Sequence, residues 1–324
     1  MGGEATRRRG PRPPGLDGVL VVAKPAGPTS HDIVALVRRL AETRRVGHGG
    51  TLDPFASGVL PVFLGRATRL VEYHLGDAKR YRATVCFGAS TTTDDLEGER
   101  TPVDAPAPDR AAVEAALPTF LGEQEQRPPA YSAVKVAGRR AYALARAGET
   151  PSLLPRRVRI DALTLLEWDD SDPTRPVAVI DVACGAGTYV RALARDVGEA
   201  VGNAAYLGAL ARTASGPFEL GDAVSLDALR TAALDGQAGV ARLLRPIDAG
   251  LEDMGSVQLA AAEADRIVLG QTVKLPPDLE STEAPVRVVD SHGRLVAIAR
   301  IRGSTLAPDK VLVDRPAAFE PAHA

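Results

Sequence analysis

The chain has 324 residues, 45% of them hydrophobic and 25% charged, which is enough to bury the core of one large domain plus a small one. No apolar run approaches the roughly 20 residues that a membrane-spanning helix needs, and only two cysteines occur, so we expect a cytoplasmic protein without disulfides. The net charge of −2 conceals an asymmetry, because residues 1–160 hold 24 Lys and Arg against 17 Asp and Glu, whereas residues 161–324 hold 15 against 24. A basic phosphate-binding face in the first half would explain this split, and solvated helix faces are the alternative.

The first elements carry clear local signals. Residues 1–15 are rich in Arg, Gly and Pro and lack the apolar segment of a secretory signal, so we expect a disordered basic arm. The β-branched run Gly18 to Lys24 predicts a buried strand. Thr29 and Asp32 have the spacing of a capping box, which predicts a helix through Leu40. Residues 44–58 break both periodicities and predict an irregular loop.

The remaining elements mix strands and helices without the regular alternation of a doubly wound fold. We expect strands at 59–64, 80–88, 131–136, 158–168 and 177–184, and helices at 67–74, 111–121, 139–147 and 188–201. This order favours an α+β domain over residues 16–248 with a mixed, mainly antiparallel sheet. After a linker near 249–255, short runs at 286–289 and 295–301 predict a small β-rich domain over residues 249–324.

Several chemistries lack their motifs. No GxxxxGK[ST] string occurs, and no dinucleotide fingerprint follows the first strand. The five histidines and two cysteines show no HExxH or paired CxxC spacing, so we expect no metal site. What remains is acid–base or nucleophilic chemistry by carboxylate, Tyr, His and Arg side chains, without a cofactor.

The segment GHGGTLDPFASGVLPVFLG at residues 47–65 closely resembles the TruB family of tRNA pseudouridine-55 synthases. The resemblance continues in four further blocks, namely KPAGPTS at 24–30, KRYRATVCFG at 79–88, PPAYSAVKVAGRRAYALARAG at 128–148 and GTYVRALARDVG at 187–198. Together these blocks span most of residues 18–215. The resemblance implies a pseudouridine synthase catalytic domain that isomerises uridine 55 in the T-loop of tRNA.

The resemblance assigns the catalytic carboxylate to Asp53. An Asp before a Pro is by itself most simply a turn or helix-start pair. Pseudouridine formation breaks the C1'–N1 bond, turns the uracil, joins C5 to C1' and removes the C5 proton. A carboxylate could attack or support the electron-poor C1', or remove a neighbouring ribose proton, and the sequence leaves both routes open.

The resemblance also places five residues around the substrate. It implies that His48 fills the space of a flipped-out uridine, that Tyr81 stacks on the flipped base and assists the late proton transfer, and that Arg191 pairs with Asp53. Tyr189 and Leu207 match positions near the target nucleotide. From the residues alone, His48 is a polar loop residue, Arg191 is a solvated side chain, and Tyr81 and Leu207 belong to the core.

Two departures from the family pattern lie near these blocks. Ala186 stands where many relatives have Lys, and Gly49 stands where Thr or Ala is usual, which puts one RNA-backbone contact and the loop geometry in doubt. The resemblance is weaker in the C-terminal region, so a PUA-like RNA-binding domain is inferred there from position and pattern. We expect a monomer that binds the tRNA elbow without an obligatory protein partner.

Three alternatives remain open. The same chemistry could act on another RNA with guide RNAs and partner proteins, although the compact bacterial-type blocks argue against this. A non-catalytic tRNA-binding or folding protein would not need Asp53, Tyr81 and Arg191. A uracil-glycosidic hydrolase would need a positioned water and usually a second carboxylate, for which Asp94 and Asp95 are the nearby candidates.

Overall fold

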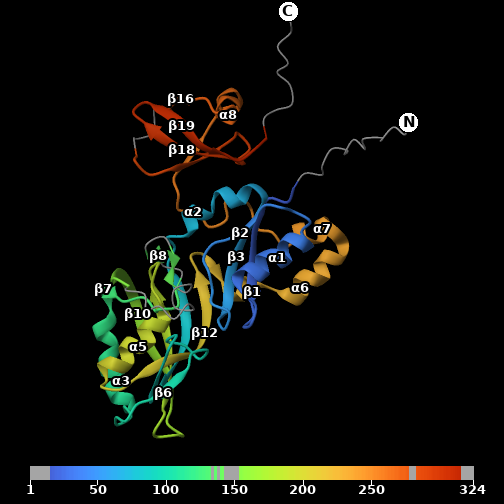
Figure 1. Cartoon of the computed structure of the whole chain (residues 1–324). Coiled ribbons are helices and arrows are strands. Elements are labelled where there is room, and N and C mark those ends of the chain that lie inside the picture. The colour runs from blue at the N-terminus through green and yellow to red at the C-terminus, as the bar shows by residue number, and fades with distance from the viewer. Residues whose placement is uncertain (1–14, 133–134, 137–138, 142–152, 277–281, 315–324) are drawn as a thin grey trace, which may run out of the picture.

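The centre of the molecule is a ten-stranded mixed sheet (Figure 1). A computed structural model describes residues 15–132, 135–136, 139–141, 153–276 and 282–314. Apart from residue 15, the expected disordered arm lies outside these residues. The strands of the sheet are β1 (Gly18–Lys24), β2 (Val46–His48), β3 (Ser57–Leu64), β4 (Lys79–Phe87), β7 (Gly122–Gln126), β10 (Arg156–Asp169), β11 (Val177–Cys184), β12 (Ala205–Ser215), β13 (Phe218–Glu219) and β14 (Val224–Ser225).

The strand order is β14-β1-β3-β12-β4-β11-β10-β7, with β2 beside β3 and β13 beside β12. Only the pairs β1–β14 and β3–β12 are parallel, and the other neighbours in the sheet are antiparallel. The expected α+β fold with a mixed, mainly antiparallel sheet is therefore confirmed. In this order, β12 brings residues from late in the chain between β3 and β4.

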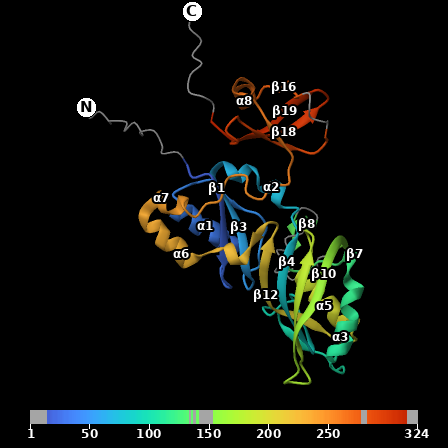
Figure 2. The same cartoon turned by 180° about the vertical axis from the view of Figure 1, so that it is seen from behind.

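Helices cover both halves of the sheet (Figures 1 and 2). Those of this part of the chain are α1 (Ser30–Leu40), α2 (Val71–His74), α3 (Arg110–Ala116), α5 (Val190–Ala200), α6 (Leu226–Ala232) and α7 (Gly236–Ala241), with 3-10 turns η1 (Gly65–Arg69), η2 (Leu117–Phe120), η3 (Leu220–Asp222) and η4 (Ala233–Asp235). Helices α1, α6 and α7 share a hydrophobic cluster with β1 and β3. Helices α3 and α5 share another with β4, β10, β11 and β12.

Helix α1 begins where the sequence predicts it. The Thr29 backbone N–H donates to Asp32 Oδ2 at 2.8 Å, and the Asp32 N–H donates to Thr29 Oγ1 at 3.1 Å. This reciprocal capping box satisfies two N–H groups that the first helical turn leaves unpaired. Ile33 and Val37 then face the core at helical spacing.

A separate five-stranded sheet follows in the C-terminal region, where the β-rich pattern predicts it. Its order is β15-β17-β18-β19-β16, with helix α8 packed on its core. Leu295 and Ile298 of β18 share a hydrophobic cluster with Leu70, which lies between η1 and α2, so the second sheet packs against that part of the expected catalytic domain. The division at residue 249 stays a prediction. The elements are β15 (Ser256–Gln258), α8 (Ala261–Val268), β16 (Val273–Lys274), β17 (Val286–Val289), β18 (Leu295–Arg302) and β19 (Thr305–Val311).

Two expectations about local structure are wrong. The loop expected at 44–58 contains β2, and β3 already begins at Ser57. The strand expected at 131–136 is instead part of a hairpin that pairs β8 (Lys135–Val136) with β9 (Arg139–Arg140). This hairpin also includes the first two residues of the helix expected at 139–147, and residues 142–147 lie outside the described residues. A second hairpin pairs β5 (Ala89–Thr91) with β6 (Arg100–Pro102). Strands of two or three residues are too short to show periodicity. Over the described residues, no helix is both long and apolar enough to cross a bilayer.

Candidate active site

Asp53 lies in the loop that connects β2 to β3, and two buried side chains anchor that loop beside it. Lys24 is 1% exposed, and its Nζ donates to the carbonyls of Pro54 at 3.2 Å and Ala56 at 2.6 Å. Ser30 Oγ donates to the Leu52 carbonyl at 3.0 Å and accepts from the Leu52 N–H at 2.9 Å. Hydrogen bonds from Lys24 and Ser30 therefore fix the backbone on both sides of Asp53.

A glycine allows β3 to lie close to β12 where the Asp53 loop ends. Gly58 is the second residue of β3 and has φ +112°, and a Cβ atom there would lie 2.1 Å from the Arg212 carbonyl oxygen. Side-chain-bearing residues rarely adopt this φ, and the approach of β12 leaves no room for one. The absence of a side chain at Gly58 therefore allows the end of the Asp53 loop to lie against β12.

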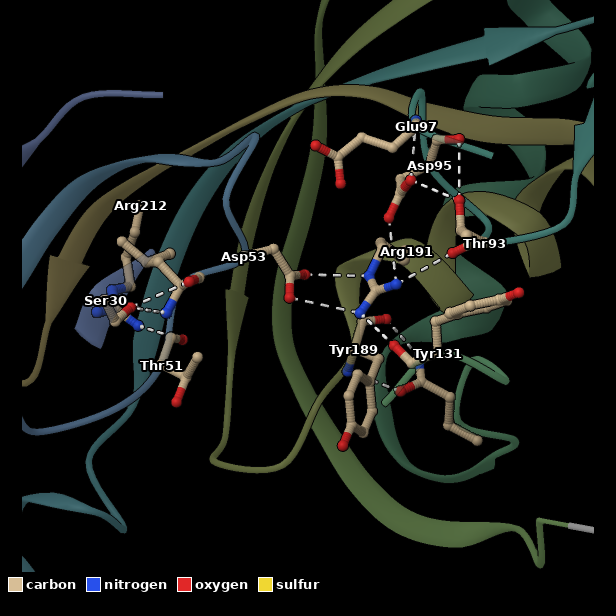
Figure 3. Close-up of polar contacts among 12 residues, drawn as sticks. Ser30, Thr51, Asp53, Thr93, Asp95, Glu97, Tyr131, Tyr189, Arg191 and Arg212 are labelled. Atoms are coloured by element: carbon tan, nitrogen blue, oxygen red, sulfur yellow. Dashed lines mark hydrogen bonds and ion pairs between the residues drawn. The ribbon is translucent and has the colours of Figure 1, made fainter. Parts of the chain in front are cut away.

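Asp53 faces Arg191, which comes from the first turn of α5 (Figure 3). Arg191 Nε lies 3.0 Å from Asp53 Oδ2, and Arg191 Nη2 donates to Asp53 Oδ1 at 3.5 Å. The Nε contact is an ion pair without the alignment of a hydrogen bond. The Asp53 side chain is 36% exposed, whereas that of Arg191 is 7% exposed. The carboxylate is thus held by a buried cation but remains open to a substrate.

A second carboxylate holds Arg191 from another side. Arg191 Nη1 lies 3.1 Å from Oδ2 of Asp95, whose side chain is 4% exposed. The other oxygen of Asp95 accepts from Thr93 Oγ1 at 2.6 Å and from the Glu97 N–H at 3.0 Å. Arg191 also donates to the Tyr131 carbonyl at 2.9 Å. The guanidinium is therefore locked in place before any substrate binds.

Burial and the neighbouring charges shift the pKa of Asp53 in opposite directions. Burial raises the pKa of the Asp53 carboxyl above its ordinary value, and the positive charge of Arg191 is the strongest influence that lowers the pKa. The neighbouring Asp95 carboxylate raises it further, and Lys24 lowers it. Burial lowers the pKa of Lys24, because it disfavours the charged ammonium, and attraction to Asp53 offsets part of this effect.

Tyr81 lies on β4, directly opposite Arg212 of β12. Its ring packs against the main hydrophobic cluster and is only partly exposed. Burial raises the pKa of the phenol, and the Arg212 guanidinium is the strongest influence in the other direction. Directly opposed residues of antiparallel strands share one face of the sheet. Tyr81 and Arg212 therefore belong to the same side of the sheet.

His48 ends β2, five residues before Asp53. Its ring meets that of His31 edge-on, with centroids 5.6 Å apart, and its Nδ1 accepts from the Gly50 N–H at 3.4 Å. Burial lowers the pKa of His48, and His31 adds to this effect. The next residue, Gly49, is the departure noted above. A Cβ there would lie 2.9 Å from Phe63 Cε2, so the Phe63 ring occupies the space that a larger residue would need.

The two remaining expected residues differ in their placement. Tyr189 caps α5 beside Arg191 (Figure 3), and its backbone N–H donates to Gln126 Oε1 at 2.8 Å. Leu207 does not line the site, because its side chain is 0% exposed in the core. Its backbone N–H instead donates to the Asp94 carbonyl at 3.0 Å. Contact between the Leu207 side chain and a nucleotide is therefore not available in this structure.

Sequence reasoning missed four residues that build the site. Lys24, Ser30 and Arg212 hold the loop, and Asp95 holds Arg191. The first two fall within the KPAGPTS block, which could have drawn attention to them. Asp95 was considered only as a hydrolytic carboxylate. Among the described residues, no three His, Cys, Asp or Glu side chains gather as metal ligands would.

Family models match three consecutive stretches of the chain. Residues 38–190 match the TruB family pseudouridylate synthase N-terminal domain. Residues 191–252 match the tRNA pseudouridylate synthase B C-terminal domain, and residues 255–312 match a C-terminal model of pseudouridine synthase II TruB. The first match contains Asp53 and Tyr81, and Arg191 opens the second.

Curated relatives match over nearly the whole chain. A protein named tRNA pseudouridine synthase B from a Synechococcus species is 45% identical over 298 residues, which cover 91% of this chain and 98% of the relative. A protein of the same name from Bradyrhizobium diazoefficiens is 43% identical over 91% of this chain and 86% of its own length. The similarity therefore includes both sheets.

Solved structures share the fold at lower identity. An archaeal box H/ACA sRNP Nop10-Cbf5 complex contains a chain that is 25% identical, with a TM-score of 0.71 over 93% of this chain and 88% of the other. A Cbf5-Nop10-Gar1 complex contains one that is 27% identical, with a TM-score of 0.69 over 93% and 86%.

Proposed function

Because the chain belongs to the TruB family of pseudouridine synthases, we propose that it isomerises uridine 55 in the T-loop of tRNA to pseudouridine. One observation supports this most directly. Asp53 is a partly exposed carboxylate whose only described ion-pair partner, Arg191, is itself held by the buried Asp95. Such an arrangement keeps one carboxylate oriented and available for a sugar, without a resident cofactor.

Asp53 is the catalytic carboxylate of this proposal. It attacks C1' of the ribose or removes a neighbouring ribose proton, while the uracil leaves as a delocalised anion. Both routes need an ionised and oriented carboxylate, which the Arg191 pair provides. The freed uracil turns, C5 bonds to C1', and the C5 proton is lost. Because the product is an isomer, no water needs activation.

Substrate binding requires the target uridine to leave the folded T-loop, at a cost of a few kcal/mol of lost stacking. In this proposal His48 fills the vacated space, and Tyr81 and Tyr189 line the site of the flipped base. Burial favours the neutral form of His48, which suits stacking between bases.

The wider assignments are also proposals. We propose that the protein works in the cytoplasm as a monomer, without an obligatory protein partner, on the T-arm at the tRNA elbow. The C-terminal sheet would serve as a PUA-like RNA-binding domain. Support comes from relatives named tRNA pseudouridine synthase B at 43–45% identity, against 25–27% for the chains of the two solved Cbf5–Nop10 complexes.

The hydrolase alternative fits the site poorly. Both oxygens of Asp95 are engaged, by Arg191 on one side and by Thr93 and the Glu97 N–H on the other. Asp94 forms an ion pair with Arg195 at 2.8 Å. Neither carboxylate is free to activate a water beside Asp53, as hydrolysis would require.

One assay separates the candidate functions. Purified protein is mixed with an unmodified tRNA transcript carrying 5-tritiated uridine, without ATP or added metal. Pseudouridine formation releases tritium to water and leaves the RNA chain intact. Release of free uracil would support the hydrolase, and tight binding without tritium release would support a non-catalytic tRNA-binding or folding protein.

A further inference from the structure

Arg212 is the largest fully buried side chain of the described residues, at 1% exposure. From β12 its guanidinium reaches three backbone carbonyls. Nε donates to Val59 at 2.8 Å, Nη2 to Gly50 at 3.1 Å and Nη1 to Thr51 at 3.4 Å. Two of these carbonyls belong to the loop immediately before Asp53. Figure 3 shows Arg212 and Thr51 on the loop side of Asp53, away from Arg191.

This buried cation has no carboxylate partner among the described residues. Such a charge is costly to bury unless nearby groups compensate it. The carbonyls provide part of the compensation. The acidic group that faces Arg212 is the phenol of Tyr81, directly opposite on β4. Arg212 also lowers the pKa of three further groups, Lys24, His48 and Lys79. None of these side chains can carry a negative charge that would compensate Arg212.

The environment of Tyr81 complements this arrangement. The groups that influence its phenol are Arg212, Asp53 and Cys184. Burial and the latter two raise the pKa of Tyr81, and Arg212 lowers it. Arg212 therefore provides the one positive charge in this set that makes negative charge on the phenol oxygen less costly.

We propose that Arg212 is a positioning residue of the reaction, which holds the loop before Asp53 against β12 and presents its positive charge to Tyr81. This inference rests on the function proposed above. When the C5–H bond breaks, its electron pair restores the C5–C6 double bond, and the Tyr81 oxygen accepts the C5 proton while its own phenol proton passes to solvent. The Arg212 charge stabilises the negative charge that develops on that oxygen during the exchange, and the carbonyl contacts keep the Asp53 loop in place beside it.

Two substitutions separate the contributions of shape and charge. Arg212→Met removes the charge at similar volume, whereas Arg212→Lys keeps the charge but carries its donors on one nitrogen, which cannot span the carbonyls that the three guanidinium nitrogens reach. The matched control is Arg230→Met on α6, because Arg230 pairs with the exposed Asp227 and with no other charged side chain of the described residues. Each variant is checked by thermal melting and for tRNA affinity by filter binding. The rate is single-turnover tritium release with saturating enzyme across a pH series.

We expect Arg212→Met to lower the single-turnover rate roughly 100-fold, with tRNA affinity changed less than about threefold. The rate of Arg212→Met should also depend more steeply on pH than that of the wild type, because without its stabilising cation the phenol gives up its proton less readily. Arg212→Lys should be slower than wild type but retain the wild-type pH profile. Arg230→Met should match wild type in every measurement.

The outcomes distinguish this inference from the proposed function. If the wild type releases no tritium, the proposed function fails. If the wild type is active, wild-type rates in both Arg212 variants overturn the positioning role, as does a loss confined to tRNA affinity. An unchanged pH profile in Arg212→Met overturns the role of its charge. If Arg212→Met does not fold, Arg212→Lys decides the matter, and a wild-type rate there contradicts the proposal.

Discussion

Arg191 and Asp95 form a buried ion pair 96 residues apart in sequence, with 3.1 Å between Nη1 and Oδ2. Asp95 binds the guanidinium through a different nitrogen from those that face Asp53. The charge of Arg191 is thus shared between a buried carboxylate that orients it and a partly exposed one that can meet a substrate. Because Asp95 orients Arg191, Asp53 can be fixed by Arg191 and still have its carboxylate accessible to a substrate.

Asp95→Asn should slow the reaction while tRNA binding changes little. The amide keeps the size of the side chain but removes the charge that orients Arg191, so Asp53 loses its fixed partner. We expect a loss of about 100-fold in single-turnover rate, the size typical of misplaced catalytic groups. Asp95→Ala should in addition lower the free energy of unfolding by about 3–5 kcal/mol, because it leaves a buried cation short of a partner. Asp227→Asn, at an exposed pair, is the control, and an equal effect there would count against this role.

On acidification, the reaction rate should begin to fall at a higher pH than it would if Asp53 had the pKa of an exposed Asp. Burial raises the pKa of Asp53, so its carboxylate takes up a proton at a higher pH than an exposed Asp does. Only the ionised form can attack C1' or accept a ribose proton. Single-turnover rates between about pH 5 and 8 should therefore show an acidic limb. Because Arg191 lowers this pKa, Arg191→Met should move the limb to higher pH, and a move to lower pH would contradict the assignment.

Gly58→Ala should destabilise the Asp53 loop more than Gly27→Ala does. The two glycines have nearly equal φ, +112° and +109°, so backbone strain is matched. A Cβ at Gly58 would meet the Arg212 backbone at 2.1 Å, whereas Gly27 has open space. Denaturant unfolding should show Gly58→Ala to be less stable than Gly27→Ala by about 2 kcal/mol. Equal losses would mean that the close approach of β12 does not constrain the loop.

Arg44→Glu combined with Arg45→Glu should weaken tRNA binding. Both side chains are exposed just before β2 and lie near His48 in sequence, within the basic half of the chain. If they contact phosphates, the slope of log affinity against log salt should become shallower by about 1 to 2. Filter binding over a salt series measures this, with Arg230→Glu as the control. An unchanged slope would remove both residues from the RNA-binding surface.

The sequence predicted the elements whose signals are local. Strand β1 follows from a β-branched run, and α1 follows from the Thr29–Asp32 capping box, which the structure contains as expected. The α+β class and the C-terminal β sheet likewise followed from the order of such elements. These signals lie within a few residues of one another, so no knowledge of the tertiary structure was needed.

Features that depend on distant pairing were not predictable in the same way. Strand β12 carries two register irregularities and crosses between β3 and β4, so its place depends on partners more than a hundred residues away. The same holds for Arg212, whose partners Gly50 and Thr51 are 162 and 161 residues distant. Resemblance to a family indicated Asp53 and Arg191, but only the three-dimensional arrangement shows what holds them.

The central claim is that Asp53 acts as the carboxylate in pseudouridine formation at position 55 of tRNA. The most direct measurement maps pseudouridine in a full-length tRNA transcript after reaction with wild type or with Asp53→Asn, by carbodiimide modification and primer extension. We expect one stop, at the T-loop uridine, with the wild type and none with Asp53→Asn, although the variant still binds the tRNA. A stop of equal strength with Asp53→Asn, or a wild-type stop only at another uridine, would contradict it.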